Sequence, residues 1–150
     1  MTNGHLDVVQ RAAALVDLLY VAVFTNTDKV PLFTSAERVD MLSAATAHLP
    51  NVRVEAAEGL LAVYARHRGI KIVVRGLRAV SDFEYELAMA EMNKHLYGDM
   101  ETLFMMTQPA YSFLSSSLVK EVARWGGDIA GFVPVHVRER LLERFADERG

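Results

Sequence analysis

The stretch that decides the fold is Ile70-Lys71-Ile72-Val73-Val74-Arg75-Gly76-Leu77-Arg78. β-Branched residues dominate its first five positions, and this composition predicts a buried strand over residues 70–74. A basic loop over residues 75–81 follows, in which Gly76 permits a tight turn or a close approach of the backbone to a ligand. A long helix is then predicted over about residues 82–97. A strand, a polar loop and a helix in this order are typical of an α/β protein.

The same alternation extends outward along the chain in both directions. Helices are predicted over about residues 5–16, 34–47, 60–67, 115–125 and 135–146, and strands over 18–24, 52–56 and 101–106. Thr34 and Glu37 have the spacing of a capping box at the start of the second helix. The pattern predicts one domain over residues 1–150 with a Rossmann-like, doubly wound parallel sheet. Ligands bind outside the carboxyl ends of such strands, so loops 25–33, 75–81 and 107–117 are the candidate site.

Composition excludes several classes of function. The 150 residues carry a net charge of −3, which gives no support to a nucleic-acid partner. The sequence contains no cysteine, which excludes disulfides, thiol nucleophiles and thiolate metal sites. No apolar run is long enough to span a bilayer and no signal peptide precedes the first helix, so we expect a cytoplasmic protein. The five histidines lack metal-ligand spacing, and we predict no metal site built from protein ligands.

The tetrad Thr2-Asn3-Gly4-His5 stands at the start of a predicted helix. The unpaired backbone N–H groups and the positive end of the helix dipole make such a position favourable for phosphate. A histidine held there can donate a hydrogen bond to charge that develops on a phosphoryl oxygen. The tetrad alone is weak support for a phosphate site, because an N-terminal histidine is usually only solvated.

Two further segments carry groups that suit phosphate. Arg75 and Arg78 can grip phosphate oxygens bidentately, or they can be loop arginines paired with Asp82, Glu84 or Glu86, and the sequence favours neither reading. Ser115, Ser116 and Ser117 stand at a helix start, where three hydroxyls offer both capping and anion contacts. Lys29 follows the first strand, although a single loop lysine is more often solvent-exposed than functional.

Taken together and in order, four segments resemble the bacterial phosphopantetheine adenylyltransferase family. They are Thr2-Asn3-Gly4-His5, Lys29 with Pro31 and Phe33, Val74-Arg75-Gly76-Leu77-Arg78-Ala79-Val80-Ser81-Asp82-Phe83-Glu84-Tyr85-Glu86, and Tyr111-Ser112-Phe113-Leu114-Ser115-Ser116-Ser117-Leu118-Val119-Lys120-Glu121. The resemblance covers essentially the whole chain. It implies an adenylyltransferase of coenzyme A biosynthesis that transfers AMP from ATP to 4′-phosphopantetheine and releases pyrophosphate. It also implies a homo-oligomer, typically a hexamer, and magnesium that accompanies the triphosphate.

The resemblance assigns roles to individual residues. His5 would contact the ATP phosphates and stabilise the transition state. Phosphopantetheine would bind to Lys29, Leu61 and Arg75. The ATP site would be lined by His5, Gly76, Leu77, Arg78, Glu86, Tyr111, Ser112, Phe113, Leu114, Ser115, Ser116 and Ser117.

The chain departs from the family at one place. Family members begin with a strand and a Gly-Ser/Thr-Phe-Asp-Pro segment ahead of Thr-x-Gly-His, whereas Met1 precedes the tetrad here. In the family that strand lies in the middle of the sheet, so its loss would leave two interior strand edges unpaired. Either the start is assigned to an internal methionine, which we favour because the downstream motifs are intact, or the shortened chain is real. In the second case it is either inactive or rescued by its oligomer.

Two other functions stay open at this point. One is a related nucleotidyltransferase that uses another phosphorylated acceptor, such as nicotinamide mononucleotide or glycerol phosphate. The other is a truncated nucleotide-binding or assembly subunit, which would bind ATP without releasing pyrophosphate.

Overall fold

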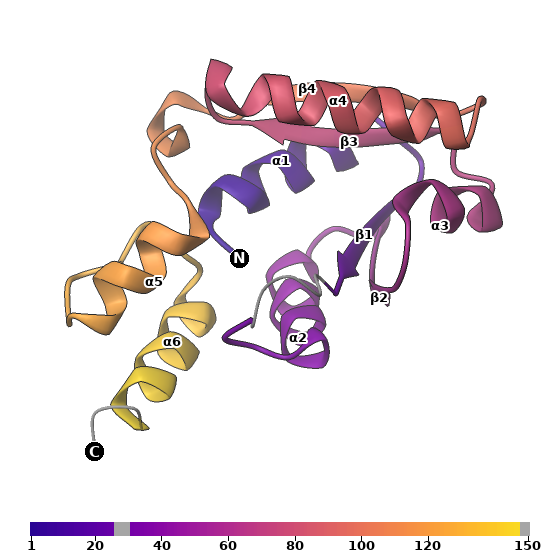
Figure 1. Cartoon of the computed structure of the whole chain (residues 1–150). Coiled ribbons are helices and arrows are strands. Elements are labelled where there is room, and N and C mark those ends of the chain that lie inside the picture. The colour runs from indigo at the N-terminus through magenta and orange to yellow at the C-terminus, as the bar shows by residue number, and fades with distance from the viewer. Residues whose placement is uncertain (26–30, 148–150) are drawn as a thin grey trace.

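Helices and parallel strands alternate in the computed structural model, which describes residues 1–25 and 31–147 (Figure 1). The elements are α1 (Asn3–Ala13), β1 (Leu19–Phe24), α2 (Ser35–Thr46), β2 (Val52–Ala57), α3 (Leu61–Arg68), β3 (Ile72–Leu77), α4 (Val80–Leu96), β4 (Glu101–Met106), the 3₁₀ turn η1 (Pro109–Tyr111), α5 (Ser116–Arg124) and α6 (Val135–Asp147). The predicted α/β alternation is confirmed. No helix within the described ranges combines the length and the apolar character that crossing a membrane requires.

The strand β3 lies further along the chain than predicted, so it includes residues 75–77, which were expected in the basic loop. It begins at Ile72 rather than at residue 70, because the Ile70 N–H donates to Ala65 O and so closes the end of α3. Gly69 makes this ending possible by adopting a left-handed conformation with φ of 67°. At its far end β3 continues through Arg75 and Gly76, which the sequence analysis placed in a loop.

The first helix is shorter than predicted and ends at Ala13 rather than near residue 16. The Asn51 side-chain amide explains the ending, since it donates to the carbonyl oxygens of Ala13 at 2.8 Å and Val16 at 2.9 Å. These bonds supply a hydrogen-bond donor to carbonyl oxygens that would otherwise have none at the helix end.

The strands form two separate parallel pairs, β1 with β2 and β3 with β4. Leu19 is opposite Val52 in the first pair, and Ile72 is opposite Glu101 in the second. One cavity touches residues 19–23 of β1 and 74–76 of β3. Consecutive strand residues point to alternate faces, so a cavity that touches all of them runs along a strand edge. The edges of β1 and β3 therefore both face this cavity.

Helices cover both faces of the second pair of strands. Arg75 on β3 bonds to Glu86 on α4, whereas the next residue, Gly76, lies against Val8 on α1. Because neighbouring strand residues point to opposite faces, α1 and α4 lie on opposite sides of β3 (Figure 1). A Cβ on Gly76 would approach the Val8 side chain to 3.1 Å, so glycine permits the close contact between β3 and α1. This arrangement is the doubly wound order that the alternation predicts.

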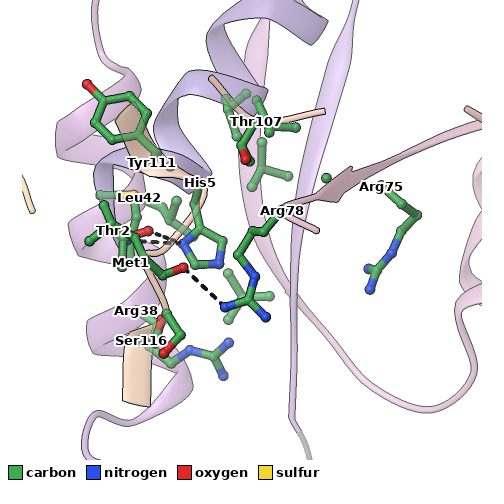
Figure 2. A pocket seen from close by; sticks show the side chains of 18 of the residues that line it. Met1, Thr2, His5, Arg38, Leu42, Arg75, Arg78, Thr107, Tyr111 and Ser116 are labelled. Atoms are coloured by element: carbon green, nitrogen blue, oxygen red, sulfur yellow. Dashed lines mark hydrogen bonds between the residues drawn. The ribbon is translucent and has the colours of Figure 1, made fainter. Parts of the chain in front are cut away.

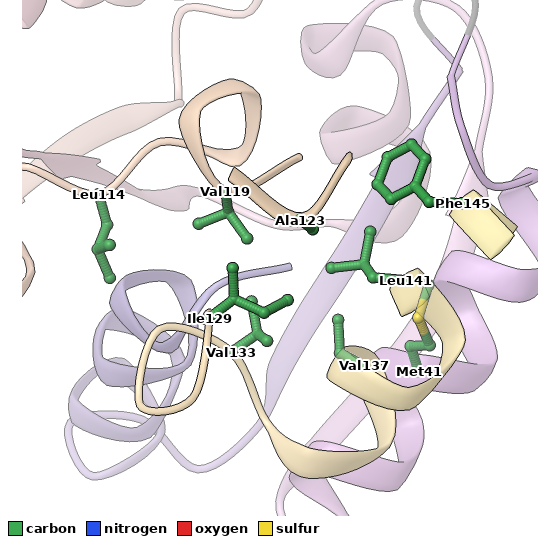
Figure 3. Close-up of a cluster of buried hydrophobic side chains, with 9 residues drawn as sticks. All are labelled: Met41, Leu114, Val119, Ala123, Ile129, Val133, Val137, Leu141 and Phe145. Carbon is green, nitrogen blue, oxygen red and sulfur yellow. The ribbon is translucent and has the colours of Figure 1, made fainter. Parts of the chain in front are cut away.

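A hydrophobic cluster in the last third of the chain holds the remaining helices (Figure 3). Its members come mainly from α5, α6 and the segment between them, joined by one residue of α2, and they are Met41, Leu114, Val119, Ala123, Ile129, Val133, Val137, Leu141 and Phe145. The backbone N–H of Asn3 donates to Phe132 O at 2.8 Å, which fixes the start of α1 against this cluster. Met41 and Leu114 also line the cavity, so the cluster supports one of its walls.

Candidate active site

A cavity of about 1270 Å³ lies between the start of α1, the edges of β1 and β3, and the start of α5 (Figure 2). It is larger than most pockets for a single small ligand, which range over about 300–1000 Å³. Nine of the predicted site residues line it, namely His5, Arg75, Gly76, Arg78, Glu86, Tyr111, Leu114, Ser115 and Ser116. Segments that are far apart in the sequence therefore meet here, as the positions of their loops predict.

His5 lies in the first turn of α1, and Thr2 holds its ring. The Thr2 backbone N–H donates to His5 Nδ1 at 3.1 Å, and Thr2 Oγ1 lies 2.8 Å from the same nitrogen. His5 is exposed where it lines the cavity, although surrounding protein atoms displace part of the water around its ring. This loss of surrounding water, followed by the positive charges of the Met1 amino group, Arg78 and Arg38, lowers the pKa of His5 to about 4. The imidazole is therefore neutral near pH 7.

Arg78 follows directly on β3, and its guanidinium lies beside His5 (Figure 2). It donates from Nη2 and Nε to the Asp82 carboxylate at 3.0 Å, and from Nη1 to Leu114 O at 3.1 Å. The hydrogen bond from Arg78 is also the main cause that lowers the pKa of Asp82. Arg78 is thus fixed between the start of α4 and the segment before α5, with part of its side chain open to solvent.

Arg75 forms a two-pronged ion pair with Glu86, with Nε–Oε2 at 2.7 Å and Nη2–Oε1 at 2.9 Å. The bonds to Glu86 raise the pKa of Arg75 above its usual value, although burial opposes this. Its guanidinium stands apart from His5 and Arg78 in Figure 2. Each arginine pairs with a carboxylate of α4, as one of the two readings predicts, and each also lines the cavity, where its contact with phosphate stays a prediction. Arg75 and Arg78 therefore place positive charge at two separate positions in the described lining of the cavity.

Only part of the predicted segment 111–117 lines the cavity. Ser115 caps α5 by accepting a hydrogen bond from the Leu118 N–H at 3.1 Å, and Ser115 and Ser116 line the cavity. The predicted site residues that are not among the lining residues are Leu61, Leu77, Ser112, Phe113 and Ser117. Leu77 is buried at the end of β3, and Phe113 packs edge-on against Phe132. Lys29 lies outside the described residues. The roles of these six residues stay predictions, as do the roles of the nine that line the cavity.

Two cationic side chains that the sequence analysis did not assign to the site also line the cavity, Arg38 on α2 and Lys120 on α5. Arg38 Nη1 donates to Phe24 O at 3.2 Å, which fixes the side chain at the carboxyl end of β1. Both residues lie within helices, away from the loops after the strands where ligands of this fold bind, and neither had been assigned a role by the family resemblance. Lys120 could have been found, because it is four residues after Ser116 and so shares its helix face.

The described lining residues do not fit a protein-built magnesium site. The carboxylates among them are Asp82 and Glu86, and each is already paired with an arginine. No group of three or more potential metal ligands exists in residues 1–25 and 31–147. A magnesium ion that enters this cavity would therefore depend on oxygens of a bound phosphate compound and on water.

Comparisons with known proteins agree with this geometry. Residues 1–122 match the family model described as cytidylyltransferase-like. The phosphopantetheine adenylyltransferase of Streptomyces coelicolor is 57% identical over 144 residues, which cover 96% of this chain and 90% of the relative. That of Heliobacterium modesticaldum is 52% identical over 147 residues, which cover 98% of this chain and 88% of the relative. A neutral histidine at a helix start, paired arginines and identity at this level lead to one conclusion: the chain belongs to the phosphopantetheine adenylyltransferase family within the cytidylyltransferase-like group.

Proposed function

We propose that this chain transfers AMP from ATP to 4′-phosphopantetheine and so forms 3′-dephospho-coenzyme A and pyrophosphate. In this reaction an oxygen of the acceptor phosphate attacks the α-phosphorus of ATP and forms a new P–O bond. The bond between the α-phosphorus and the oxygen that bridges to the β-phosphate breaks, and pyrophosphate leaves with that electron pair. The reverse reaction uses the same groups.

The observation that carries this proposal is a large cavity with two cationic positions and no free carboxylate among its described lining residues. The reaction brings together two anionic substrates, and their phosphates repel each other. A protein accelerates it by holding both substrates in line and by stabilising the charge of the transition state. No covalent nucleophile is required.

Each position suits one substrate. His5 and Arg78 lie together at the start of α1, where the positive end of the helix dipole would also favour a triphosphate. Arg75 stands apart and would hold the phosphate of the acceptor, as the family resemblance implies. Arg38, whose charge acts on His5, and Lys120 add positive charge to the cavity wall and would attract the same phosphates. Magnesium would enter with ATP, coordinated by phosphate oxygens and water.

We also propose that the chain assembles into a homo-oligomer, a hexamer by the family resemblance, and works in the cytoplasm, where ATP is available. An exposed apolar stripe on α4 supports assembly. Met89, Met92 and Leu96 are 41%, 56% and 38% exposed, and their spacing places them on one helix face. Light scattering should give six copies for the wild type and a smaller species for Met92→Glu.

The reaction is tested with an acceptor panel. Wild-type protein is incubated with ATP, magnesium and either 4′-phosphopantetheine, nicotinamide mononucleotide or glycerol phosphate, and the products are identified by mass. We expect dephospho-coenzyme A from the first acceptor and no adenylylated product from the other two. An adenylylated product only with another acceptor would assign a related nucleotidyltransferase activity. ATP binding without any product would leave a nucleotide-binding subunit without turnover.

A further inference from the structure

The helix α1 begins with an unusual capping box. In such a box the third helical residue accepts a hydrogen bond from the backbone N–H of the capping residue, and this residue is normally glutamate or glutamine. At the start of α2 the rule holds, since the Thr34 N–H donates to Glu37 Oε2 at 2.7 Å. At the start of α1 the acceptor is His5, through Nδ1.

The chemistry of the donor decides which nitrogen of His5 carries the proton. A backbone N–H can only donate, so Nδ1 must be without a proton in the contact with Thr2. A neutral imidazole keeps one proton, which then resides on Nε2. The Thr2 hydroxyl, 2.8 Å from the same bare nitrogen, is also a donor in this arrangement.

The other ring nitrogen faces the reactants. His5 lines the cavity, and Figure 2 shows one ring nitrogen toward Thr2 and the other toward the space beside Arg78. Within the described part of the chain Nε2 makes no hydrogen bond, because both bonds of the ring are to Nδ1. The nearby guanidinium of Arg78 has no acceptor atom, and its charge disfavours a second proton on the ring. The Nε2–H is thus available to a phosphate oxygen.

We propose that Thr2 is a positioning residue, whose backbone N–H and hydroxyl keep Nδ1 of His5 bare so that Nε2 presents its proton to the phosphates. This inference rests on the proposed function and adds to it the form in which His5 acts. The ring is a neutral hydrogen-bond donor rather than a cation or a proton-transferring acid. Thr2 is buried, with 2% of its surface exposed, so the donor is fixed before substrate binds.

The first test reads the tautomer directly in the substrate-free wild-type chain. Protein with ¹⁵N-labelled histidine is studied by ring-nitrogen NMR near pH 7, and the His5 signals are assigned by their loss in His5→Ala. We expect a protonated Nε2 and a bare Nδ1. A proton on Nδ1, or on both nitrogens, would overturn the proposal. Because no turnover is needed, an inactive chain with the Nε2 proton would contradict the proposed reaction alone.

The second test separates the two donors of Thr2. Thr2→Val keeps the N–H and should retain the tautomer with a turnover loss of a few-fold, while Thr2→Ser should match the wild type. Thr2→Pro removes both the N–H and the hydroxyl, so its difference from Thr2→Val reports the N–H alone. It should give a mixture of tautomers, with turnover lowered about tenfold and the Michaelis constant for ATP changed less. A folded Thr2→Pro with the wild-type tautomer and turnover would refute the role.

The matched control is Thr34→Pro, which removes the equivalent N–H at the start of α2. It should lower stability in the same way as Thr2→Pro while the His5 tautomer and turnover stay unchanged. If both proline variants lower turnover equally, the effect is one of helix stability and the proposal is wrong. If Thr2→Pro does not fold, the wild-type and Thr2→Val spectra still decide the result.

Discussion

The starts of α1 and α2 share the capping-box motif but have different surroundings. Both are capping boxes that begin with threonine, and in both the third helical side chain accepts a hydrogen bond from the threonine N–H. At α2 that side chain is Glu37, which also pairs with Arg144 of α6 and so joins two helices. At α1 it is His5, which opens onto the cavity. One motif therefore serves packing in one region and chemistry in the other, and the third position decides which.

The largest effect on turnover is expected from a substitution at His5. His5→Ala should lower turnover by about 100-fold or more, equivalent to about 2.7 kcal/mol, because it removes a donor to the transition state. ATP affinity should change less. Pyrophosphate release and calorimetric ATP binding measure the two quantities. Glu37→Ala is the matched control at α2, and its turnover per folded molecule should stay within about twofold of the wild type. Equal losses of turnover and affinity in His5→Ala would make His5 only a binding contact.

Arg75 lines the cavity but takes no part in a helix cap, so its substitution tests substrate binding alone. Arg75→Ala should raise the Michaelis constant for 4′-phosphopantetheine about tenfold and change that for ATP little, because a charged hydrogen bond to the acceptor phosphate is lost. Lys71→Ala is a suitable control, since Lys71 pairs with Asp99 on the surface rather than in the cavity. An unchanged constant for the acceptor in Arg75→Ala would contradict the role assigned to it.

A smaller effect is expected at the start of α2. Thr34→Ala should lower the free energy of unfolding by about 1 kcal/mol, because Thr34 Oγ1 accepts from the Glu37 N–H at 3.2 Å and the substitution leaves this donor without its cap. Turnover per folded molecule should be unaffected. Denaturant unfolding and pyrophosphate release are measured on the same sample. A turnover loss beyond about twofold would show that the α2 start also takes part in the reaction.

The starts of α1 and α2 should contribute to the pH dependence of the free energy of unfolding in different pH ranges. The folded pKa of His5 is about 4 and its ordinary value is 6.5, so the unfolded state binds more protons between these values. Stability therefore falls as the pH drops from 6.5 toward 4, by about 1 kcal/mol once screening by cavity water is allowed for. The pKa of Glu37 is held below 4.5, chiefly by the bond from the Thr34 N–H, so its contribution is lost only as the pH falls below 4.5.

The free energy of unfolding measured at several pH values tests this separation. His5→Asn should flatten the curve between pH 6.5 and 4, whereas Glu37→Gln should change it only at lower pH. A His5→Asn curve identical to that of the wild type would show that the ring is protonated equally in the folded and unfolded states.

The sequence predicted what depends on local patterns. The Thr34 and Glu37 spacing indicated the second helix, and the β-branched run before Arg75 indicated a strand, although the strand continues to Leu77. The position of His5 at a helix start also followed from the local pattern. These features are encoded within a few residues, so one stretch of sequence is enough to find them.

Tertiary features were harder to predict. Arg38 reaches the cavity only because α2 packs beside β1, and Arg75 meets Glu86 only because α4 covers β3. The bond between Thr2 and His5 is local, but the usual capping-box pattern requires glutamate or glutamine at the third position, so the pattern did not reveal it. The sheet edges that face the cavity followed from the family resemblance, not from the strand pattern.

The most direct test of the account compares pyrophosphate release by the wild type, His5→Ala and Glu37→Ala, with ATP and magnesium, in the presence and absence of 4′-phosphopantetheine. We expect release by the wild type that requires the acceptor, a loss of about 100-fold in His5→Ala, and retention of release in Glu37→Ala. Equal release by the wild type and His5→Ala, or no acceptor-dependent release from folded wild-type protein, would contradict it.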